Sequence, residues 1–328
     1  MRTTVVVTVL LAALLVSAAA AVFVGAVAID PGSVLAALFG SDDTNGTIIR
    51  ELRLPRVLGA ILVGGALAAS GVLLQGLLRN PLADPFVTGT QAGASLGAVF
   101  AISLGASAAF VPLASFAGAL LAIGLVWRLA HLGGRTTVLT VLLAGVVLTS
   151  FAGAVITLVL TSSDRLSLRL RAVLGWLQGG VSVVSWNELA VAAVVIGAGV
   201  TLALFLAPRI DAYAFGEETA AALGIDLDRT TGAVLATTAL LTGAAVAIAG
   251  LVGFVGLVVP HALRFLLGAT HRRLLIASLP AGAAVLVLAD LGARTLLAPA
   301  ELPAGVITGL VGAPFFLGLL VRSRRVIV

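Results

Sequence analysis

The chain of 328 residues is 60% hydrophobic and only 10% charged, with a mean hydropathy of +1.21. Soluble domains carry about 25% charged residues, so this composition excludes a protein that covers itself with a water-facing surface. The formal net charge of +5 comes from arginine alone, and these arginines stand in loops between apolar runs, as membrane topology requires, so we expect no nucleic-acid partner.

Ten apolar stretches follow one another along the chain, and each is predicted to be a membrane-spanning helix. A span needs about 20 apolar residues, which the length accommodates with short loops. Barrel strands would show a two-residue alternation, which is missing here. The predicted fold is an all-α integral membrane protein, with residues 1–328 forming a single transmembrane domain. The expected spans are 4–28, 55–78, 88–108, 112–131, 138–161, 188–208, 231–250, 252–268, 274–293 and 304–321.

The N-terminal stretch has some features of a signal peptide, namely Arg2, an apolar run from Val5, and small residues from Ser17 to Ala21. The apolar run continues to about Ala28, which is long enough to cross the bilayer. We therefore expect a retained first helix.

Arginine placement predicts the orientation. With the N-terminus inside, ten spans put both termini in the cytoplasm and twelve of the 19 arginines on that side. This bias agrees with the positive-inside rule. The inner set is Arg2, Arg79, Arg128, Arg135, Arg209, Arg229, Arg264, Arg272, Arg273, Arg322, Arg324 and Arg325. The outer set, which topology does not explain, is Arg50, Arg53, Arg56, Arg165, Arg169, Arg171 and Arg294.

A faint internal repeat links the two halves of the chain. Residues 64–71 (GGALAASG) align with residues 243–250 (GAAVAIAG), and the same spacing pairs Pro81 with Pro260. Five expected spans separate the copies, so the second would be inverted, as in many transporters. We predict pseudo-repeats of about 1–185 and 186–328, although small-residue stretches also match by chance.

The longest polar interruption on the cytoplasmic side covers residues 211–226. Glu217 and Glu218 precede an alanine-rich segment that ends at Gly224, a pattern typical of a short capped helix. Such a helix would offer a contact for another protein, and an ordinary interfacial turn is the alternative. Pro81, Pro85 and Pro260 are expected to break helices and free backbone groups near a cavity or interface.

Seven motifs in order resemble the permease subunits of FecCD-type ABC importers, which take up iron–siderophore complexes, haem and vitamin B12. The motifs are RLPR, GALAASGVLLQGLLRNPLADP, LGWLQGG, EETAAALG, GFVGLVVPHALR, ADLGARTLL and ELPAGVITGLVGAPFF. One departure is Thr270, where an acidic residue commonly precedes the histidine. The resemblance implies the type II importer permease fold and a homodimer, or a heterodimer of related permeases. It also implies two cytoplasmic ABC ATPase subunits and an extracytoplasmic solute-binding protein.

The resemblance assigns two groups of residues. Arg53, Arg56 and Arg294 would face outward and hold acidic residues of the binding protein. The group that couples to the ATPase would be Phe215, Gly216, Glu217, Glu218, Ala221, Leu223, Gly224, His261 and Arg264.

The sequence predicts no catalytic residues, no metal site and no cofactor. Without lysine there is no Walker A motif, so ATP and Mg would be used by the partner ATPase. Asp84, Asp290 and Glu301 lie near span ends beside proline or arginine, which favours capping or ion pairing over catalysis.

Candidate linings of a translocation pathway are Ser70, Gln75 and Gln91, with helix packing as the alternative. An ion-coupled secondary transporter would also have many spans, but it would place an ionisable residue at mid-membrane, and no convincing one is found. A membrane-embedded enzyme would need a polar catalytic cluster within the spans, which is likewise missing.

Overall fold

The computed structural model describes residues 2–25, 29–40, 44–131, 137–162, 169–181 and 185–324, and every element in these ranges is helical. The long helices are α1 (Arg2–Phe23), α4 (Leu54–Leu77), α5 (Thr90–Leu104), α6 (Phe110–His131), α7 (Val138–Thr161), α10 (Trp186–Tyr213), α12 (Leu227–Ala249), α13 (Val255–Leu267), α14 (His271–Thr295) and α15 (Ala304–Arg324). The short elements are α2 (Pro31–Leu38), α3 (Thr44–Thr47), η1 (Ile48–Arg53), η2 (Pro85–Thr88), α9 (Leu170–Gln178) and α11 (Glu217–Ala222).

Each of the ten predicted spans corresponds to one long helix, which confirms the all-α membrane fold. Among the described residues, seven helices are long and apolar enough to cross a bilayer. The apolar helices at 90–104, 255–267 and 304–318 are shorter. The first two are the glycine-rich spans bordered by proline, and at about 1.5 Å per residue neither crosses about 30 Å of hydrocarbon alone. Arg135 and Arg165 lie outside the described residues.

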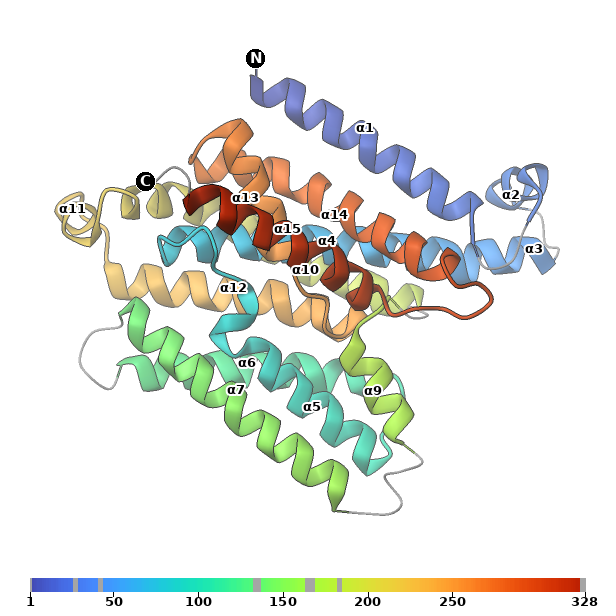
Figure 1. Cartoon of the computed structure of the whole chain (residues 1–328), viewed down its shortest axis with the longest axis horizontal. Helices are drawn as coiled ribbons and strands as arrows, with labels where there is room; N and C mark the ends of the chain where they lie inside the picture. The colour runs from blue at the N-terminus through green and yellow to red at the C-terminus, as the bar shows by residue number, and fades with distance from the viewer. Residues whose placement is uncertain are drawn as a thin grey trace.

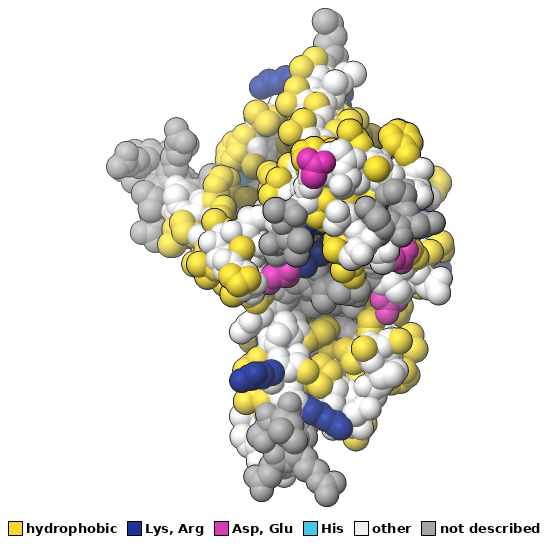
Figure 2. All heavy atoms as spheres, turned by 90° about the vertical axis from the view of Figure 1, so that its right-hand side faces the viewer, with side chains coloured by type: hydrophobic (Ala, Val, Ile, Leu, Met, Phe, Trp, Pro, Cys, Tyr) yellow, Lys and Arg dark blue, Asp and Glu magenta, His cyan; other side chains and the backbone are white. Residues whose placement is uncertain are grey.

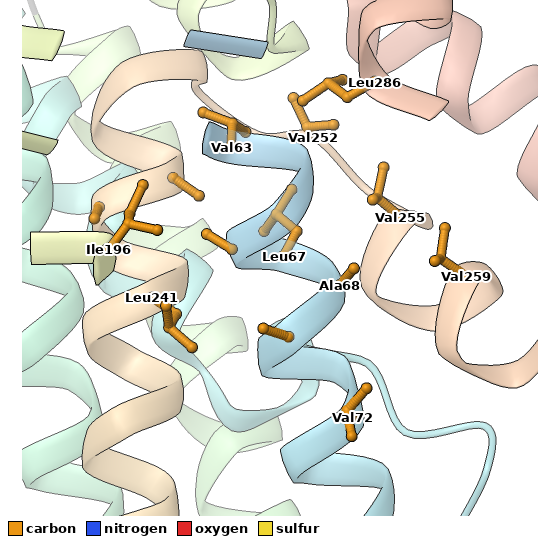
Figure 3. Close-up of a cluster of buried hydrophobic side chains, with 14 of the residues drawn as sticks. Val63, Leu67, Ala68, Val72, Ile196, Leu241, Val252, Val255, Val259 and Leu286 are labelled. Atoms are coloured by element: carbon orange, nitrogen blue, oxygen red, sulfur yellow. The ribbon is translucent and has the colours of Figure 1, made fainter. Parts of the chain in front are cut away.

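Helix α4 runs through the middle of the bundle and packs against α14, α12, α10 and α13 (Figure 1). Figure 3 shows Val63, Leu67 and Val72 of α4 among apolar side chains from these neighbours. Lipid tails are as apolar as leucine, so hydrophobicity alone does not hold helices together inside a membrane. Close van der Waals packing around α4 therefore supplies much of the association energy.

Two glycine contacts bring backbones together around α4. A Cβ on Gly64 would lie 2.2 Å from the Gly282 carbonyl oxygen of α14, and one on Gly71 would lie 1.8 Å from the Gly256 carbonyl oxygen of α13. Both distances are shorter than any real carbon–oxygen contact, so only glycine fits. These positions explain the small-residue stretch that begins at Gly64.

Pro260 lies inside α13, so the helix break expected there is wrong, whereas the expected free backbone group is present. Proline has no N–H, so the carbonyl of Gly256, four residues earlier, loses its helical donor. The buried Gln75 amide of α4 lies 3.4 Å from that oxygen and 3.1 Å from the Leu257 carbonyl oxygen, and donates to both. Pro81, its proposed repeat partner, lies in the turn after α4, so the two prolines occupy different local structures. The pseudo-repeat stays a prediction.

The remaining helices surround this centre. Helices α5, α6 and α7 pack on one another, and α6 also contacts α12. Helix α1 contacts mainly α14 and stands at the edge of the bundle (Figure 1).

The α4–α14 contact predicts the effect of one added methyl group. We expect Gly64→Ala to force the helices apart and lower the free energy of unfolding by about 1–3 kcal/mol, as overpacking does. Gly65→Ala is the matched control, since its Cβ would have no neighbour closer than 3.4 Å. Thermal unfolding of the purified protein in detergent measures both. Equal midpoints for the two variants would contradict this packing.

Candidate functional site

The predicted short helix is present as α11, between α10 and α12. Gly216 precedes it with φ +100° and Gly224 follows it with φ +82°, backbone conformations that favour glycine. The side chains of Phe215 and Leu223 are 75% and 67% exposed, whereas Ala220 is fully buried. The helix therefore has a fixed inner face and apolar side chains projecting at both ends.

An ion pair joins α11 to the end of α4. The Arg79 guanidinium lies 3.2 Å from the Glu217 carboxylate. The Tyr213 hydroxyl donates to the Leu227 carbonyl at 2.9 Å and links the helices that flank α11. Because Arg79 lies two residues after the last residue of α4, a displacement of α11 has a direct contact through which to reach the central helix.

His261 and Arg264 lie on α13, which runs toward the same end of the bundle. The buried Nε and Nη2 atoms of Arg264 and the Nδ1 atom of His261 have no hydrogen-bond partner among the described residues. His271, at the start of α14, is held by Asp211, with Nδ1 2.6 Å from the carboxylate oxygen. Unpaired buried donors are costly, so the role of Arg264 in contact with a partner stays a prediction.

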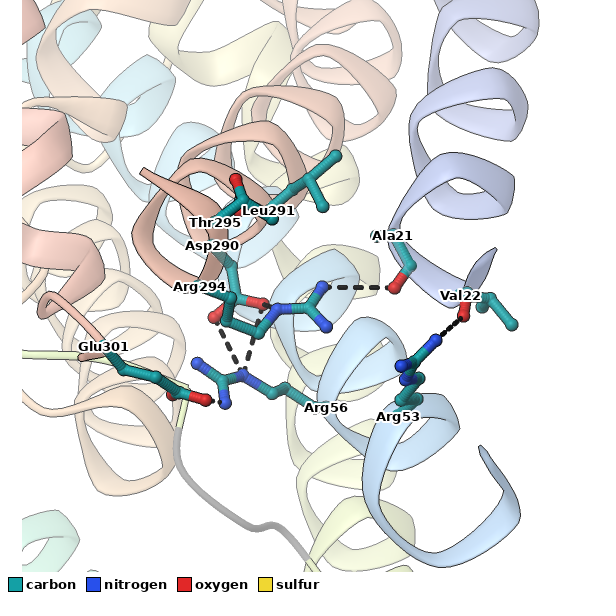
Figure 4. Close-up of polar contacts among 9 residues, drawn as sticks. All are labelled: Ala21, Val22, Arg53, Arg56, Asp290, Leu291, Arg294, Thr295 and Glu301. Atoms are coloured by element: carbon teal, nitrogen blue, oxygen red, sulfur yellow. Dashed lines mark hydrogen bonds and ion pairs between the residues drawn. The ribbon is translucent and has the colours of Figure 1, made fainter. Parts of the chain in front are cut away.

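The other end of α4 carries a cluster of ion pairs (Figure 4). The Arg56 Nε atom lies 3.0 Å from Asp290, and its Nη1 atom lies 2.9 Å from Glu301. Arg294 forms an ion pair with Asp290 at 3.0 Å. These contacts confirm ion pairing as the role of Asp290 and Glu301. Asp84 caps η2 by accepting from the Phe86 N–H, also as expected.

Burial separates the members of this cluster. The side chains of Asp290 and Arg294 are 2% and 4% exposed, Arg56 is 18% exposed and Glu301 is 44% exposed. Exposure thus increases from a buried pair on α14 to the half-exposed carboxylate of Glu301. Glu301 is thus the member that an approaching molecule meets first.

Arg53 and Arg294 also hold the end of α1. Arg53 donates to the Val22 and Phe23 carbonyls at 2.8 and 3.1 Å, and Arg294 donates to the Ala21 carbonyl at 3.2 Å. The last carbonyls of a helix lack intrahelical donors and attract positive charge. Sequence reasoning missed this contact, because an apolar run carries no sign of where its terminal carbonyls point.

The structure changes what is expected of the three arginines that were predicted to face outward. Arg53 and Arg294 are 5% and 3% exposed and engaged within the chain, because α1 covers them. Only Arg56 of the three presents part of its side chain to solvent. Docking of a partner stays a prediction for this group.

The candidate pathway residues fall into two kinds. Ser70 and Gln75 are 0% and 2% exposed and point into the helix contacts of α4, so in this conformation they line no open surface. Ser70 receives a hydrogen bond from Thr242 of α12, and Gln75 holds α13. These contacts agree with the packing alternative. Gln91 at the start of α5 is partly exposed, and its pathway role stays a prediction.

Figure 2 views the bundle from the end at which α2 and α3 lie, and shows a few charged side chains among yellow apolar surface. On α7, Leu143, Val147 and Phe151 are more than half exposed. Such surfaces are excluded from water and face lipid or another membrane protein.

A helical bundle with apolar flanks, an exposed short helix at one end and an arginine–carboxylate cluster at the other is a multi-pass membrane protein. Residues 10–322 match the FecCD transport family, and the chain belongs to that family.

Named relatives agree. The chain is 43% identical to the cobalamin import system permease protein of Halobacterium salinarum, over 88% of this chain and 77% of that one. It is 38% identical to the hemin transport system permease protein of Yersinia pestis, over 87% and 86%. It is 36% identical to the iron(3+)-hydroxamate import system permease protein of Bacillus subtilis, over 93% and 80%.

A solved structure, described as an inward-facing conformation of a metal-chelate type ABC transporter, superposes with a TM-score of 0.85. It is 31% identical, and the match covers 98% of this chain and 99% of that one. The chain is therefore an ABC importer permease of the FecCD type.

The buried ion pairs predict the effect of Arg294→Gln. The variant removes one partner of a buried carboxylate and one donor to α1, so we expect a loss of about 1–3 kcal/mol in stability. Arg229→Gln is the control, because Arg229 is 89% exposed and, among the described residues, pairs with Asp226 at the N-terminus of its own helix. Thermal unfolding and protease sensitivity after α1 are the measurements. Equal effects of the two substitutions would contradict a structural role for Arg294.

Proposed function

We propose that two copies of this chain, or one copy and a related permease, form the membrane channel of an importer driven by two cytoplasmic ATPases. A solute-binding protein outside the cell delivers the cargo, and both termini of the chain lie in the cytoplasm. An iron–siderophore complex is the first candidate cargo, followed by vitamin B12 and haem. The permease relatives named for cobalamin, hemin and iron-hydroxamate support this class of cargo.

One observation carries the proposal, namely that α4 connects two candidate contact sites. Its 24 residues extend about 36 Å at about 1.5 Å per residue. Arg56 lies near its first residue, and Arg79, which pairs with Glu217 of α11, follows its last. A partner bound at each end would thus be connected by one helix.

The mechanism we infer is alternating access. ATP binding draws the two ATPases together, and the movement reaches the bundle through α11. Phe215 and Leu223, exposed on either side of α11, would seat in an apolar hollow of the ATPase. Arg264 would receive an acidic side chain of the same partner. No step breaks a covalent bond in the permease, and ATP with Mg is consumed on the partner.

Transport in vesicles tests the function. We expect uptake of iron–siderophore by the reconstituted permease only with ATP, the ATPase and the binding protein together. Parallel measurements with haem and cobalamin identify the cargo. Uptake by this chain alone under a proton or sodium gradient would instead establish an ion-coupled transporter and overturn the proposal.

The α11 contact has its own test. We expect the double variant Phe215→Ala, Leu223→Ala to fold normally, because both side chains are exposed, and to lose most ATPase binding and uptake. Phe39→Ala is the matched control, since Phe39 is 90% exposed and directly follows α2, which lies far from α11 in Figure 1. Co-purification with the ATPase and ATP hydrolysed per cargo imported are the measurements. Unchanged binding and coupling in the double variant would remove α11 from the mechanism.

A further inference from the structure

Arg56 is already occupied in this structure, and its two carboxylate partners are unequal. Asp290 accepts from Nε at 3.0 Å and is 2% exposed, whereas Glu301 accepts from Nη1 at 2.9 Å and is 44% exposed. Asp290 also pairs with Arg294, so a second ion pair holds its carboxylate in place. Glu301 has no other ion pair among the described residues.

Charge balance limits what can bind here. Arg56 and Arg294 are matched by Asp290 and Glu301, so the four side chains sum to zero. A further carboxylate would give this set a net negative charge and would compete with the two carboxylates already present. Nε and Nη1 of Arg56 already donate to these carboxylates, so an acidic partner engages Arg56 best when one of the two leaves.

The free-energy cost of releasing Asp290 from Arg56 differs greatly from the cost of releasing Glu301. Removing Asp290 would leave the buried Arg294 guanidinium unpaired, and breaking a buried pair typically costs several kcal/mol. Releasing the half-exposed Glu301 into water gives up an interaction of the strength of a surface ion pair, which is small. Glu301 is therefore the replaceable carboxylate.

We propose that Glu301 occupies the docking position on Arg56 in the free permease, and that a carboxylate of the binding protein replaces it on docking. This inference rests on the proposed importer function. The partner it fits presents an aspartate or glutamate side chain directed at Arg56.

The position of Glu301 gives the exchange a consequence inside the membrane. Glu301 lies three residues before α15, in a segment where Leu296 and Leu297 are 66% and 58% exposed. The Arg56–Glu301 pair joins the start of α15 to the start of α4. Its release removes one of the contacts that fix where α15 enters the bundle, so docking loosens the entry of α15.

Binding-protein affinity for the full permease–ATPase complex in nanodiscs tests the exchange. We expect Glu301→Gln to tighten binding about two- to fivefold, because the neutral amide competes less well for Arg56. Arg56→Gln should weaken binding tenfold or more, and in that background Glu301→Gln should bring no gain. Glu51→Gln is the control for general charge, since Glu51 is exposed near the same end of α4 and should leave the affinity unchanged.

The outcomes separate the two proposals. If Arg56→Gln weakens binding but Glu301→Gln does not tighten it, the exchange is wrong and docking at Arg56 stands. A gain from Glu301→Gln that persists in the Arg56→Gln background, or that Glu51→Gln reproduces, also overturns the exchange. A wild-type complex that does not bind the solute-binding protein at all overturns the importer proposal itself.

A second readout follows the release directly. The chain has no cysteine, so Leu297→Cys and Leu58→Cys can carry spin labels without background. The distribution of distances between the two labels should broaden when the binding protein docks. In the Glu301→Gln variant it should already be broad without the binding protein. A narrow distribution in both conditions contradicts release of Glu301.

Discussion

The fold depends on the contact of α4 with its neighbours at glycine. At Gly64 and Gly71 a single methyl group would meet the carbonyls of Gly282 and Gly256, so the backbones touch directly. Inside a bilayer water cannot satisfy exposed backbone groups, and lipid competes equally for apolar side chains. Helices therefore gain the most association free energy where their backbones approach most closely. The same closeness brings the Gln75 amide within reach of the carbonyl that Pro260 leaves free.

This rigid centre also places the charges. Asp290 and Arg294 stand one helical turn apart on α14, and Arg56 reaches them because α4 lies directly against α14. A buried ion pair adds little net stability, since desolvation offsets its attraction, but it fixes which groups face one another. Here it fixes the end of α1 and leaves Arg56 at the edge of the cluster. The position of α1 thus depends on the packing of two other helices.

Much of this architecture could be predicted from sequence, because span length and apolarity are local properties. All ten spans and the short helix α11 could be predicted in this way. The burial of Arg53, Ser70 and Gln75 could not be predicted from the sequence, because it depends on which helix covers each side chain. The helix break expected at Pro260 was wrong for a related reason, because the carbonyl that Pro260 frees accepts from an amide 185 positions earlier in the chain, at Gln75. Ion pairing of Asp290 and Glu301 was predictable, whereas the choice of Arg56 as their shared partner was not.

A central helix this tightly packed is a poor moving part. Any shift of α4 along its axis would drive Gly64 and Gly71 past backbone carbonyls that leave no room for even a methyl group. Helices α1 and α7 are held differently, since most of their side chains face outward. Helix α15 shares this character, with Leu310, Val311 and Leu317 more than 60% exposed. We therefore infer that α4, α12 and α14 form the frame, and that access alternates through the peripheral helices. On this view the contacts at the two ends of α4 act by releasing or holding those helices, while α4 keeps the two sites at a constant separation.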